Sequence, residues 1–320
     1  PSLKHHTPDG FRNTHSTGHQ PGDVDRWQKE RKAAGLPKPP SSGYDAFIQT
    51  WWQPVELNAR PEDGAWWLGH ASVLLRMDGR YLLTDPVFSH RASPVPFLGP
   101  QRKTPPAITV ESLPPLDALL ISHNHYDHLD AATVRKLLRR FPGLTVFVPL
   151  GLGDWFRRRG AKNVVELDWW QNANWQGITL TAVPAQHWSM RTPWNRNRSL
   201  WCGWVVEGRQ HRFWFSGDTG YSPELLLIPE RLGAIDFAAL PIGAYAPEWF
   251  MAVHHMNPHS AVALWQGLGC PTAFPIHWGV FELADESLDE PVQALRRALD
   301  NVAPVNNSFR ILKIGEYLSV

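Results

Sequence analysis

The segment that most constrains this chain is His123-Asn124-His125-Tyr126-Asp127-His128. It follows residues 118–122, an apolar run that predicts a buried strand, and it leads into residues 129–141, whose apolar positions recur at helical spacing. Side chains alternate along an extended segment, so the rings of the His-x-His pair point to one side. The aspartate and the last histidine fall where the chain turns into the helix and can face a second ion. Because imidazole and carboxylate groups bind zinc and similar divalent ions, the segment predicts a metal site.

Further side chains of ligand type follow later predicted strands. They are His187, Asp218 and His277. Taken singly, each is about as well explained as a hydrogen-bonded core histidine or an aspartate that caps a turn. Together with the first segment they make five histidines and two aspartates. That number suits two metal ions that share one carboxylate.

Short apolar runs separated by turn residues predict a layered α/β fold with helices outside the sheets. The predicted strands are 71–75, 81–84, 118–122, 145–148, 178–183, 200–206, 213–216, 237–240 and 272–276. The predicted helices are 129–141, 258–268 and 288–300. Residues 1–60 are rich in Pro, Gly, Ser, His and Lys, which predicts an extended arm with one helix near 24–34 that packs on a domain formed by residues 61–320.

Composition restricts the class of protein. The 320 residues carry 31 Lys and Arg against 30 Asp and Glu, a balance that argues against a dedicated nucleic-acid binder. Cys202 and Cys270 form no CxxC pair and are expected to be packing residues. The chain has no apolar run of about 18 residues, so we expect a soluble or peripheral protein, with the cytoplasm favoured. A targeting segment removed before Pro1 stays open.

Several further residues are candidates for roles around the metals. Asp85 and His70 end early predicted strands, where they can orient metal-bound imidazoles, although Asp85 can equally hold the turn before Pro86. The loop 188–199 mixes Trp188 and Arg191 with other Trp and Arg residues and is a candidate for contact with a phosphate headgroup, or else an ordinary solvated loop. Arg157, Arg158 and Arg159 are expected on a solvated helix face. The 17 tryptophans fit core packing or a surface that meets lipid.

The ligand motif resembles that of the metallo-β-lactamase superfamily. Within it, the chain is similar to the branch that contains N-acyl-phosphatidylethanolamine-hydrolysing phospholipase D and the bacterial RomA-like and UlaG-like hydrolases. The stretches that carry this closer resemblance include Trp67-Leu68-Gly69-His70-Ala71, Leu83-Thr84-Asp85-Pro86-Val87-Phe88 and Pro184-Ala185-Gln186-His187-Trp188. The resemblance covers residues 60–320. It implies a four-layer αβ/βα sandwich with the metals between the sheets at one edge.

The resemblance also implies roles for individual residues. One zinc ion would be held by His123, His125 and His187, and the other by Asp127, His128 and His277, with Asp218 as the bridge; Mn, Fe or Co are alternatives. Asp127 and His255 are the implied catalytic residues, with His255 as proton donor, and Tyr245 would bind substrate. His254 and His259 receive no role. A homodimer is implied as well.

The leading hypothesis is a phosphodiesterase that uses a metal-activated hydroxide on N-acyl-phosphatidylethanolamine-like phospholipids. The expected partners are a phospholipid or small phosphorylated substrate and a peripheral membrane surface, with no nucleic acid. One alternative is a lactonase acting on a phosphorylated sugar, as in other UlaG-like members. A nuclease is less compatible with the balanced charge. A metal-binding scaffold without activity is the non-enzymatic alternative, and no ligand position speaks for it, because all seven carry competent residues.

Overall fold

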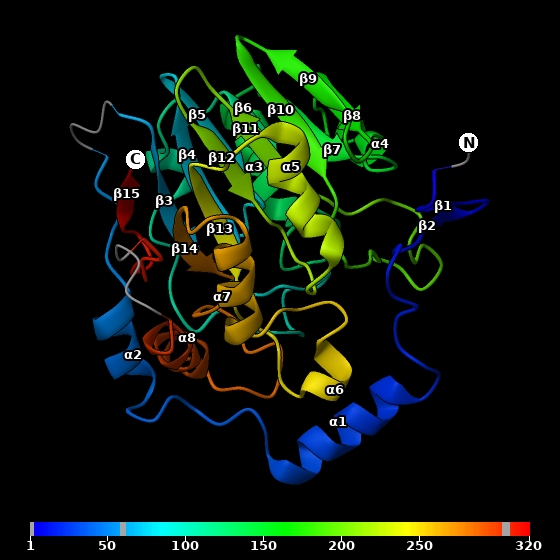
Figure 1. Cartoon of the computed structure of the whole chain (residues 1–320), viewed down its shortest axis with the longest axis vertical. Coiled ribbons are helices and arrows are strands. Elements are labelled where there is room, and N and C mark those ends of the chain that lie inside the picture. Colours follow the sequence, from blue (N-terminus) through cyan, green and yellow to red (C-terminus); the bar gives the residue numbers. More distant parts are fainter. Residues whose placement is uncertain (1–2, 58–61, 303–307) are drawn as a thin grey trace.

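In the computed structural model, which describes residues 3–57, 62–302 and 308–320, two β-sheets lie face to face (Figure 1). The larger sheet has the strand order β15 (Tyr317–Ser319), β3 (Gly64–Gly69), β4 (Ser72–Met77), β5 (Arg80–Thr84), β6 (Ala118–Leu120), β7 (Thr145–Pro149) and β8 (Asn163–Leu167). The smaller sheet has the order β14 (Thr272–Ile276), β13 (Phe237–Pro241), β12 (Arg212–Phe215), β11 (Gly203–Glu207), β10 (Ile178–Val183) and β9 (Asn172–Trp175). Each sheet joins antiparallel hairpins to parallel strands.

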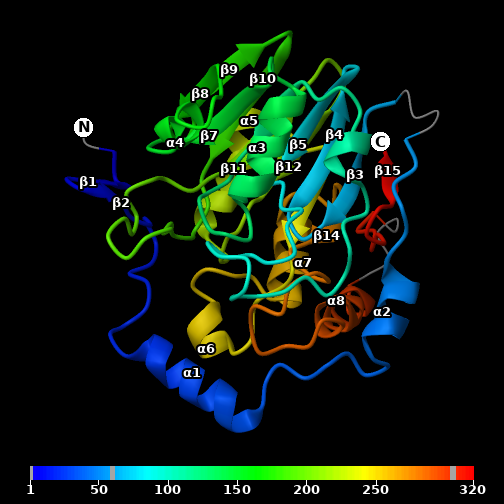
Figure 2. The same cartoon turned by 180° about the vertical axis from the view of Figure 1, so that it is seen from behind.

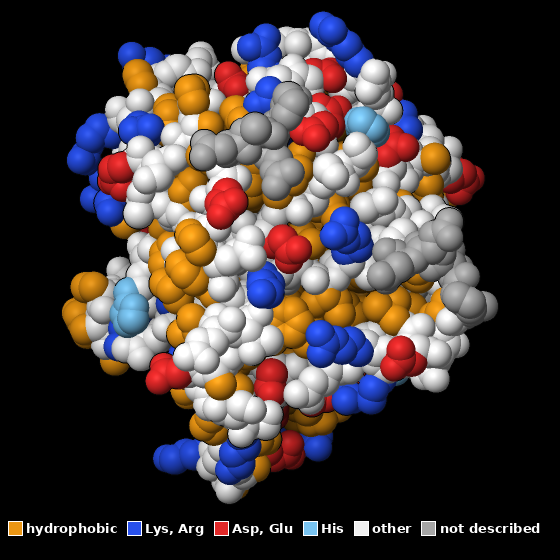
Figure 3. Space-filling model, turned by 90° about the vertical axis from the view of Figure 1, so that its left-hand side faces the viewer, with side chains coloured by type: hydrophobic (Ala, Val, Ile, Leu, Met, Phe, Trp, Pro, Cys, Tyr) orange, Lys and Arg blue, Asp and Glu red, His pale blue; other side chains and the backbone are white. Residues whose placement is uncertain are grey.

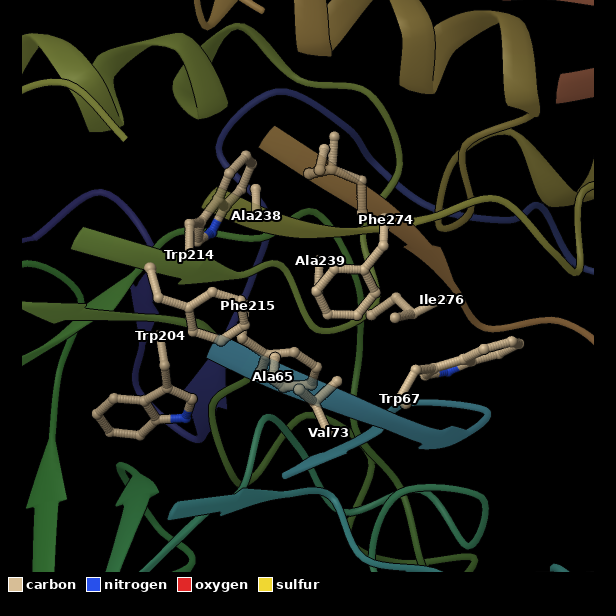
Figure 4. Packing of buried hydrophobic residues seen from close by; sticks show 14 of the residues in the cluster. Ala65, Trp67, Val73, Trp204, Trp214, Phe215, Ala238, Ala239, Phe274 and Ile276 are labelled. Atoms are coloured by element: carbon tan, nitrogen blue, oxygen red, sulfur yellow. The ribbon is translucent and has the colours of Figure 1, made fainter. Parts of the chain in front are cut away.

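The main hydrophobic core fills the space between the two sheets. Along β3, Ala65 and Trp67 face this core, whereas Trp66 and Leu68 belong to a second cluster on the outer side of the larger sheet. This period of two is the alternation that a strand imposes on its side chains. Figure 4 shows this core, with Ala65 and Trp67 of the larger sheet and aromatic side chains such as Trp204 of the smaller sheet. The core-packing interpretation of the tryptophans therefore holds for these three.

Helices cover the outer faces of both sheets (Figures 1 and 2). On the larger sheet, α3 (Ala131–Arg140) buries Val134 and Leu137. On the smaller sheet, α7 (Pro258–Gly267) is capped by Asn257, whose side chain accepts from the backbone N–H of Ser260. The other helices after residue 62 are α4 (Gly153–Arg157), α5 (Leu227–Leu232), α6 (Glu248–Met251), α8 (Glu290–Asp300) and the 3-10 turns η1 (Val110–Ser112) and η2 (Pro223–Leu226). This arrangement confirms the predicted αβ/βα sandwich.

The predicted strands and long helices are present within a few residues, and the hairpin between β4 and β5 turns at Asp78 and Gly79, both with positive φ. The prediction missed β3, β8, β9 and β15. Because β3 is buried on both faces, it has no polar alternation to reveal it. On β9, Asn172 and Asn174 are exposed and Ala173 and Trp175 half-buried, so few apolar residues mark it.

Residues 3–57 run along the outside of the sandwich (Figure 1). They contain the short hairpin of β1 (His6–Thr7) and β2 (Gly10–Phe11), followed by α1 (Asp23–Ala34) and α2 (Tyr44–Trp51). The Trp27 ring of α1 stacks on Phe250 at 4.8 Å between centroids. Nε2 atoms of His5 and His6 lie 2.6 and 2.7 Å from the two carboxylate oxygens of Asp168. The predicted boundary at residues 60 and 61 lies outside the described residues, so the division into arm and domain stays a prediction.

The surface carries charges of both signs. Figure 3 shows the side of the molecule where β15, α2 and α8 lie, and acidic and basic side chains alternate over it without a basic stripe. That distribution agrees with the formal net charge of +1. Over the described ranges, the helices all fall short of the length and apolar character that a membrane-crossing helix requires.

Candidate metal centre

The seven predicted ligands come from segments that follow strands of both sheets. The motif 123–128 follows β6 of the larger sheet, and His187, Asp218 and His277 follow β10, β12 and β14 of the smaller sheet. The carboxyl ends of these strands meet at one edge of the sandwich, so segments far apart in sequence converge there. The structure brings all seven side chains into one cluster. Their role as metal ligands stays a proposal.

Three imidazoles form the first half of the cluster. Nδ1 of His125 lies 2.9 Å from Nε2 of His123 and 3.2 Å from Nε2 of His187. A single proton on the His125 atom can satisfy one of these contacts but not both. Three nitrogen atoms that converge at this distance without enough protons to share form a donor set suited to a cation.

Hydrogen bonds on the far side of two rings fix which nitrogen faces the cluster. Nδ1 of His123 lies 2.8 Å from Oγ of Ser122, whose hydroxyl donates to Oδ2 of Asp85 at 2.5 Å. The hydroxyl proton is thereby used, so His123 donates its Nδ1–H to Ser122. Likewise, Nδ1 of His187 donates to the carbonyl of His254 at 3.0 Å. Both rings therefore direct an Nε2 lone pair into the cluster.

The second half of the cluster combines two imidazoles with a carboxylate. Oδ2 of Asp127 lies 3.2 Å from Nε2 of His128 and 3.4 Å from Nε2 of His277. His70 donates from Nε2 to the same oxygen at 2.8 Å, so the predicted supporting residue lies directly behind the carboxylate. His70 and His277 have positive φ values of 51° and 62°, a left-handed backbone that costs energy for these residues and recurs at functional sites.

Asp218 lies between the two halves. Its Oδ2 is 2.9 Å from Nε2 of His128 and 3.1 Å from that of His277. The same oxygen is 3.5 Å from Nε2 of His187 and 3.8 Å from Nε2 of His123. A carboxylate within reach of both halves is the geometry that a bridging ligand requires.

The unpaired atoms test whether these residues fit metal ions. Nε2 of His128 and Nε2 of His277 face the carboxylates of Asp127 and Asp218 at 2.9–3.4 Å, yet among the described residues these buried atoms and Oδ1 of Asp218 make no contact with hydrogen-bond geometry. A buried polar atom left unpaired costs about 1–3 kcal/mol, so several in one place point to a missing electrophilic partner. Nitrogen and carboxylate donors are those of zinc, manganese, iron and cobalt. The residues fit two divalent ions.

The pKa values of the histidines differ between the two halves of the cluster. Burial lowers the pKa of His123 and His187 well below the usual range, which keeps both rings neutral. Burial by itself would raise the pKa of Asp218, but the neighbouring His128 and His277 hold it well below its ordinary value. Asp218 is therefore ionised, and His123 and His187 are neutral lone-pair donors. Burial would lower the pKa of His128 and His277 as well, but the neighbouring carboxylates of Asp218 and Asp127 raise both, that of His277 to about 9.

Asp85 orients two predicted ligands, His128 directly and His123 through Ser122. It is fully buried and accepts three hydrogen bonds, from the backbone N–H of Ser122 at 2.8 Å, from the hydroxyl of Ser122 and from Nδ1 of His128 at 2.6 Å. Burial raises the pKa of Asp85, and these donors offset part of that rise. The contacts match the predicted orienting role rather than a local hold on the turn before Pro86. Sequence reasoning named Asp85 but missed Ser122.

Asn13 is a second residue that sequence reasoning missed. Its side-chain Nδ2 donates to the carbonyl of His187 at 2.8 Å, and its Oδ1 accepts from the backbone N–H of His187 at 3.1 Å and from Nε1 of Trp201 at 3.2 Å. The amide thus holds both backbone groups of a predicted ligand. Because 174 residues separate the pair, no local pattern could reveal it.

The predicted catalytic and substrate residues separate into two groups. The ring of His255 lies 5.2 Å from that of His187 and 5.3 Å from that of His277, with a buried Nδ1 that is unpartnered within the described structure. Tyr245 is different. Burial together with Glu286 raises its pKa, and in the described ranges no hydrogen bond, ion pair or ring contact joins it to the cluster.

A cleft of about 450 Å³ opens beside the metal cluster. His125 and Asp127 line its inner end. Trp188 lies edge-on to His125 at 4.3 Å, and Arg191 donates from Nη1 to the carbonyls of Asn124 and Leu129 at 3.0 and 2.6 Å. The other lining residues are mostly apolar: Ala92, Pro100, Tyr126, Met190, Thr192, Pro193 and Leu283. Both predicted substrate residues of this loop therefore lie at the cleft.

Two facing sheets with a His/Asp cluster at their common edge define a metallo-β-lactamase type of fold. The family model described as "Beta-lactamase superfamily domain" matches residues 80–278. The chain therefore belongs to the β-lactamase superfamily, which confirms the resemblance carried by the ligand motif.

Two curated relatives carry more specific names. The chain is 41% identical over 264 residues to "N-acyl-phosphatidylethanolamine-hydrolyzing phospholipase D 1" of Caenorhabditis elegans, covering 79% of this chain and 74% of the worm protein. It is 35% identical over 240 residues to "N-acyl-phosphatidylethanolamine-hydrolyzing phospholipase D, mitochondrial" of Saccharomyces cerevisiae. That match covers 72% of this chain and half of the yeast protein. The likeness places the chain near this branch.

Solved structures share the fold at lower identity. Isothiocyanate hydrolase from Delia radicum gut bacteria superposes with a TM-score of 0.65 at 17% identity, over 80% of this chain and 98% of that one. CmlA, a diiron β-hydroxylase from Streptomyces venezuelae, superposes with a TM-score of 0.60 at 23% identity, over 82% of this chain and 55% of that one. These neighbours establish the fold.

Replacing Asp85 with Ala should weaken metal retention by about 10–100-fold, because His128 and Ser122 lose the acceptor that orients the ligands. Competition against a chromophoric chelator measures the affinity for Zn²⁺, and elemental analysis measures bound metal. The matched control is Asp300→Ala, which removes an exposed carboxylate at the end of α8. Metal content equal to that of the unmodified protein would contradict the role of Asp85.

Replacing Asn13 with Ala should lower Zn²⁺ affinity by about 10-fold or more, because the backbone of His187 loses its amide clamp. Asn13→Asp keeps the acceptor and loses the donor, so an intermediate affinity is expected. Asn174→Ala, at an exposed position of β9, serves as the control. If Asn13→Ala binds Zn²⁺ as tightly as this control, the residue has no positioning role.

Proposed function

We propose that the chain is a metal-dependent phosphodiesterase that hydrolyses N-acyl-phosphatidylethanolamine-like phospholipids on the headgroup side of the phosphate. The observation that carries the proposal is the combination of a complete His/Asp cluster with 41% identity to a worm protein of that name. The proposed metals are two zinc ions. The seven ligand positions would divide as the resemblance implies, with Asp218 shared.

Divalent ions bound at these positions supply Lewis-acid polarisation of a phosphoryl oxygen and lower the pKa of a coordinated water. The chain's own residues then divide the remaining tasks. Asp127 and Asp218 balance the charge of the ions, and the Ser122–Asp85 relay keeps the ligand rings oriented. His255 is proposed to give a proton to the oxygen that leaves phosphorus, because its ring borders the rings of two ligands and carries an unpartnered Nδ1.

The cleft supports a lipid rather than a small polar substrate. Its lining is largely apolar, which suits acyl chains next to the phosphate. Two loops that line it also carry strongly exposed apolar residues. In the loop 88–101 these are Phe97 and Leu98, exposed by 69% and 63%, and in the loop 188–199 it is Trp194, exposed by 81%. Side chains of this type favour a membrane interface, so we propose peripheral contact there. A homodimer and a role for Tyr245 stay predictions.

The proposed reaction has defined products. Zinc-loaded protein incubated with an N-acyl-phosphatidylethanolamine in detergent micelles should release phosphatidic acid and an N-acylethanolamine, both measured by mass spectrometry. Removing the metal with a chelator, or substituting His123→Ala, should reduce release to background. His259→Ala, at an exposed position of α7, should leave it intact. A metal-loaded protein that releases neither product would refute the assignment of substrate.

Substituting His255→Ala should lower kcat by about 10²–10⁴-fold, the range that a positioned proton donor contributes. Bound metal should stay at the level of the unmodified protein, because His255 is not among the seven ligand positions. Turnover and elemental analysis on the same preparation separate the two effects. An unchanged kcat would remove His255 from the mechanism.

A further inference from the structure

A second, larger cavity of about 1300 Å³ borders the metal cleft. The two share Tyr126, Arg191 and Thr192, which form a common wall. Six arginines line the larger one, and we refer to it as the arginine cavity: Arg91, Arg135, Arg158, Arg159, Arg191 and Arg198. They come from four separate segments of the chain, so tertiary packing gathers them.

Carboxylates in the lining do not neutralise these arginines. Asp130 caps α3, where it accepts from Ala132, and it also accepts from Ser89 and Thr133. Asp154 pairs with Arg157 at 2.8 Å, a residue outside the lining. Two carboxylates stand against six arginines, so the cavity keeps a marked excess of positive charge.

Several of the arginines have free guanidinium groups. In the described part of the chain, the side chains of Arg135, Arg158 and Arg198 have no acceptor or acidic partner. Arg135, Arg158 and Arg159 line the same cavity, and burial, with Arg135 and Arg158 nearby, lowers the pKa of Arg159. Such a set is electrostatically unfavourable by itself and is relieved by an anion.

The sequence predicted a solvated helix face for Arg157–Arg159. All three side chains are exposed, and Arg157 matches that prediction through its ion pair with Asp154. Arg158 and Arg159 instead line the cavity. Spacing along one short helix could not reveal which arginines from other segments would face them.

We propose that the arginine cavity is a second anion site, separate from the hydrolytic centre, that binds a phosphate-bearing group. Guanidinium groups form paired hydrogen bonds to phosphate oxygens, and several around one cavity suit a ligand with more than one negative charge. The phosphate can come from a neighbouring lipid headgroup or from a soluble phosphate ester. The position of the cavity between the loops that bear Phe97 and Trp194 favours the lipid.

The test compares binding of two probes to the full, metal-loaded chain. Vesicles of phosphatidylcholine mixed with phosphatidic acid supply a lipid phosphate, pure phosphatidylcholine vesicles serve as the reference, and glycerol 3-phosphate supplies a soluble ester. In Arg135→Glu/Arg158→Glu, affinity for the phosphate probe should fall about 10-fold or more. Within the described part of the chain, neither side chain makes a hydrogen bond or an ion pair that the change would break. Arg198→Glu, in a different loop, gives an independent variant.

The matched control is Lys29→Glu/Lys32→Glu, which changes the net charge equally at two exposed positions of α1, a helix that contributes no residue to the cavity lining. Its affinity should stay within about 2-fold of the unmodified protein, because surface charges beyond a Debye length of about 10 Å are screened. Thermal unfolding checks that each variant folds.

The outcomes distinguish a lipid headgroup from a soluble ester as the source of the phosphate. Loss of binding to acidic vesicles in the cavity variants identifies a lipid headgroup, and loss of glycerol 3-phosphate binding identifies a soluble ester. The proposal is overturned if the unmodified protein binds neither probe, or if the cavity variants bind as the control does. Because every readout is binding, the result is independent of whether the chain hydrolyses N-acyl-phosphatidylethanolamine.

Discussion

The buried carboxylate of Asp85 is the interaction on which the candidate site depends. It accepts from the backbone and hydroxyl of Ser122 and from Nδ1 of His128. One side chain therefore joins the end of β5 to the segment after β6 and orients ligands in both halves of the cluster, His123 through Ser122 and His128 directly. A fully buried carboxylate is costly unless its hydrogen bonds are satisfied, so this network ties the stability of the strand ends to the orientation of the ligands.

The packing of the two sheets brings the predicted ligands of the smaller sheet to those that Asp85 orients. His123 and His128 come from the larger sheet, whereas His187, Asp218 and His277 come from the smaller one. A large aromatic core sets the distance between the two sheets. Figure 4 shows Trp67 of the larger sheet and Trp204 of the smaller sheet among the residues of this core. Since close-packed interiors resist small displacements, the core holds the two groups of predicted ligands close together, with His128 2.9 Å from Asp218 and His125 3.2 Å from His187.

Segments outside the two sheets contact the cluster or line the cavities beside it. The N-terminal segment supplies Asn13 to the backbone of His187. The loops 88–101 and 188–199 separate the apolar cleft from the arginine cavity and carry exposed apolar tips. A phospholipid has the same two parts, apolar chains and a phosphate, and the proposals for the two cavities use this correspondence. The metal centre, the cleft and the arginine cavity thus form adjacent compartments of one face.

The sequence by itself determined the layered fold and predicted which seven side chains would meet at the sheet edge, with Asp85 beside them, because residue type and spacing at strand ends are local properties. Tertiary structure decided the rest. Asn13 reaches His187 across 174 positions, and six arginines gather from separate segments. Tyr245 was assigned to the substrate by resemblance, yet among the described residues no hydrogen bond, ion pair or ring contact joins it to the cluster. Such contacts depend on how distant surfaces pack, and short-range patterns carry no record of that packing.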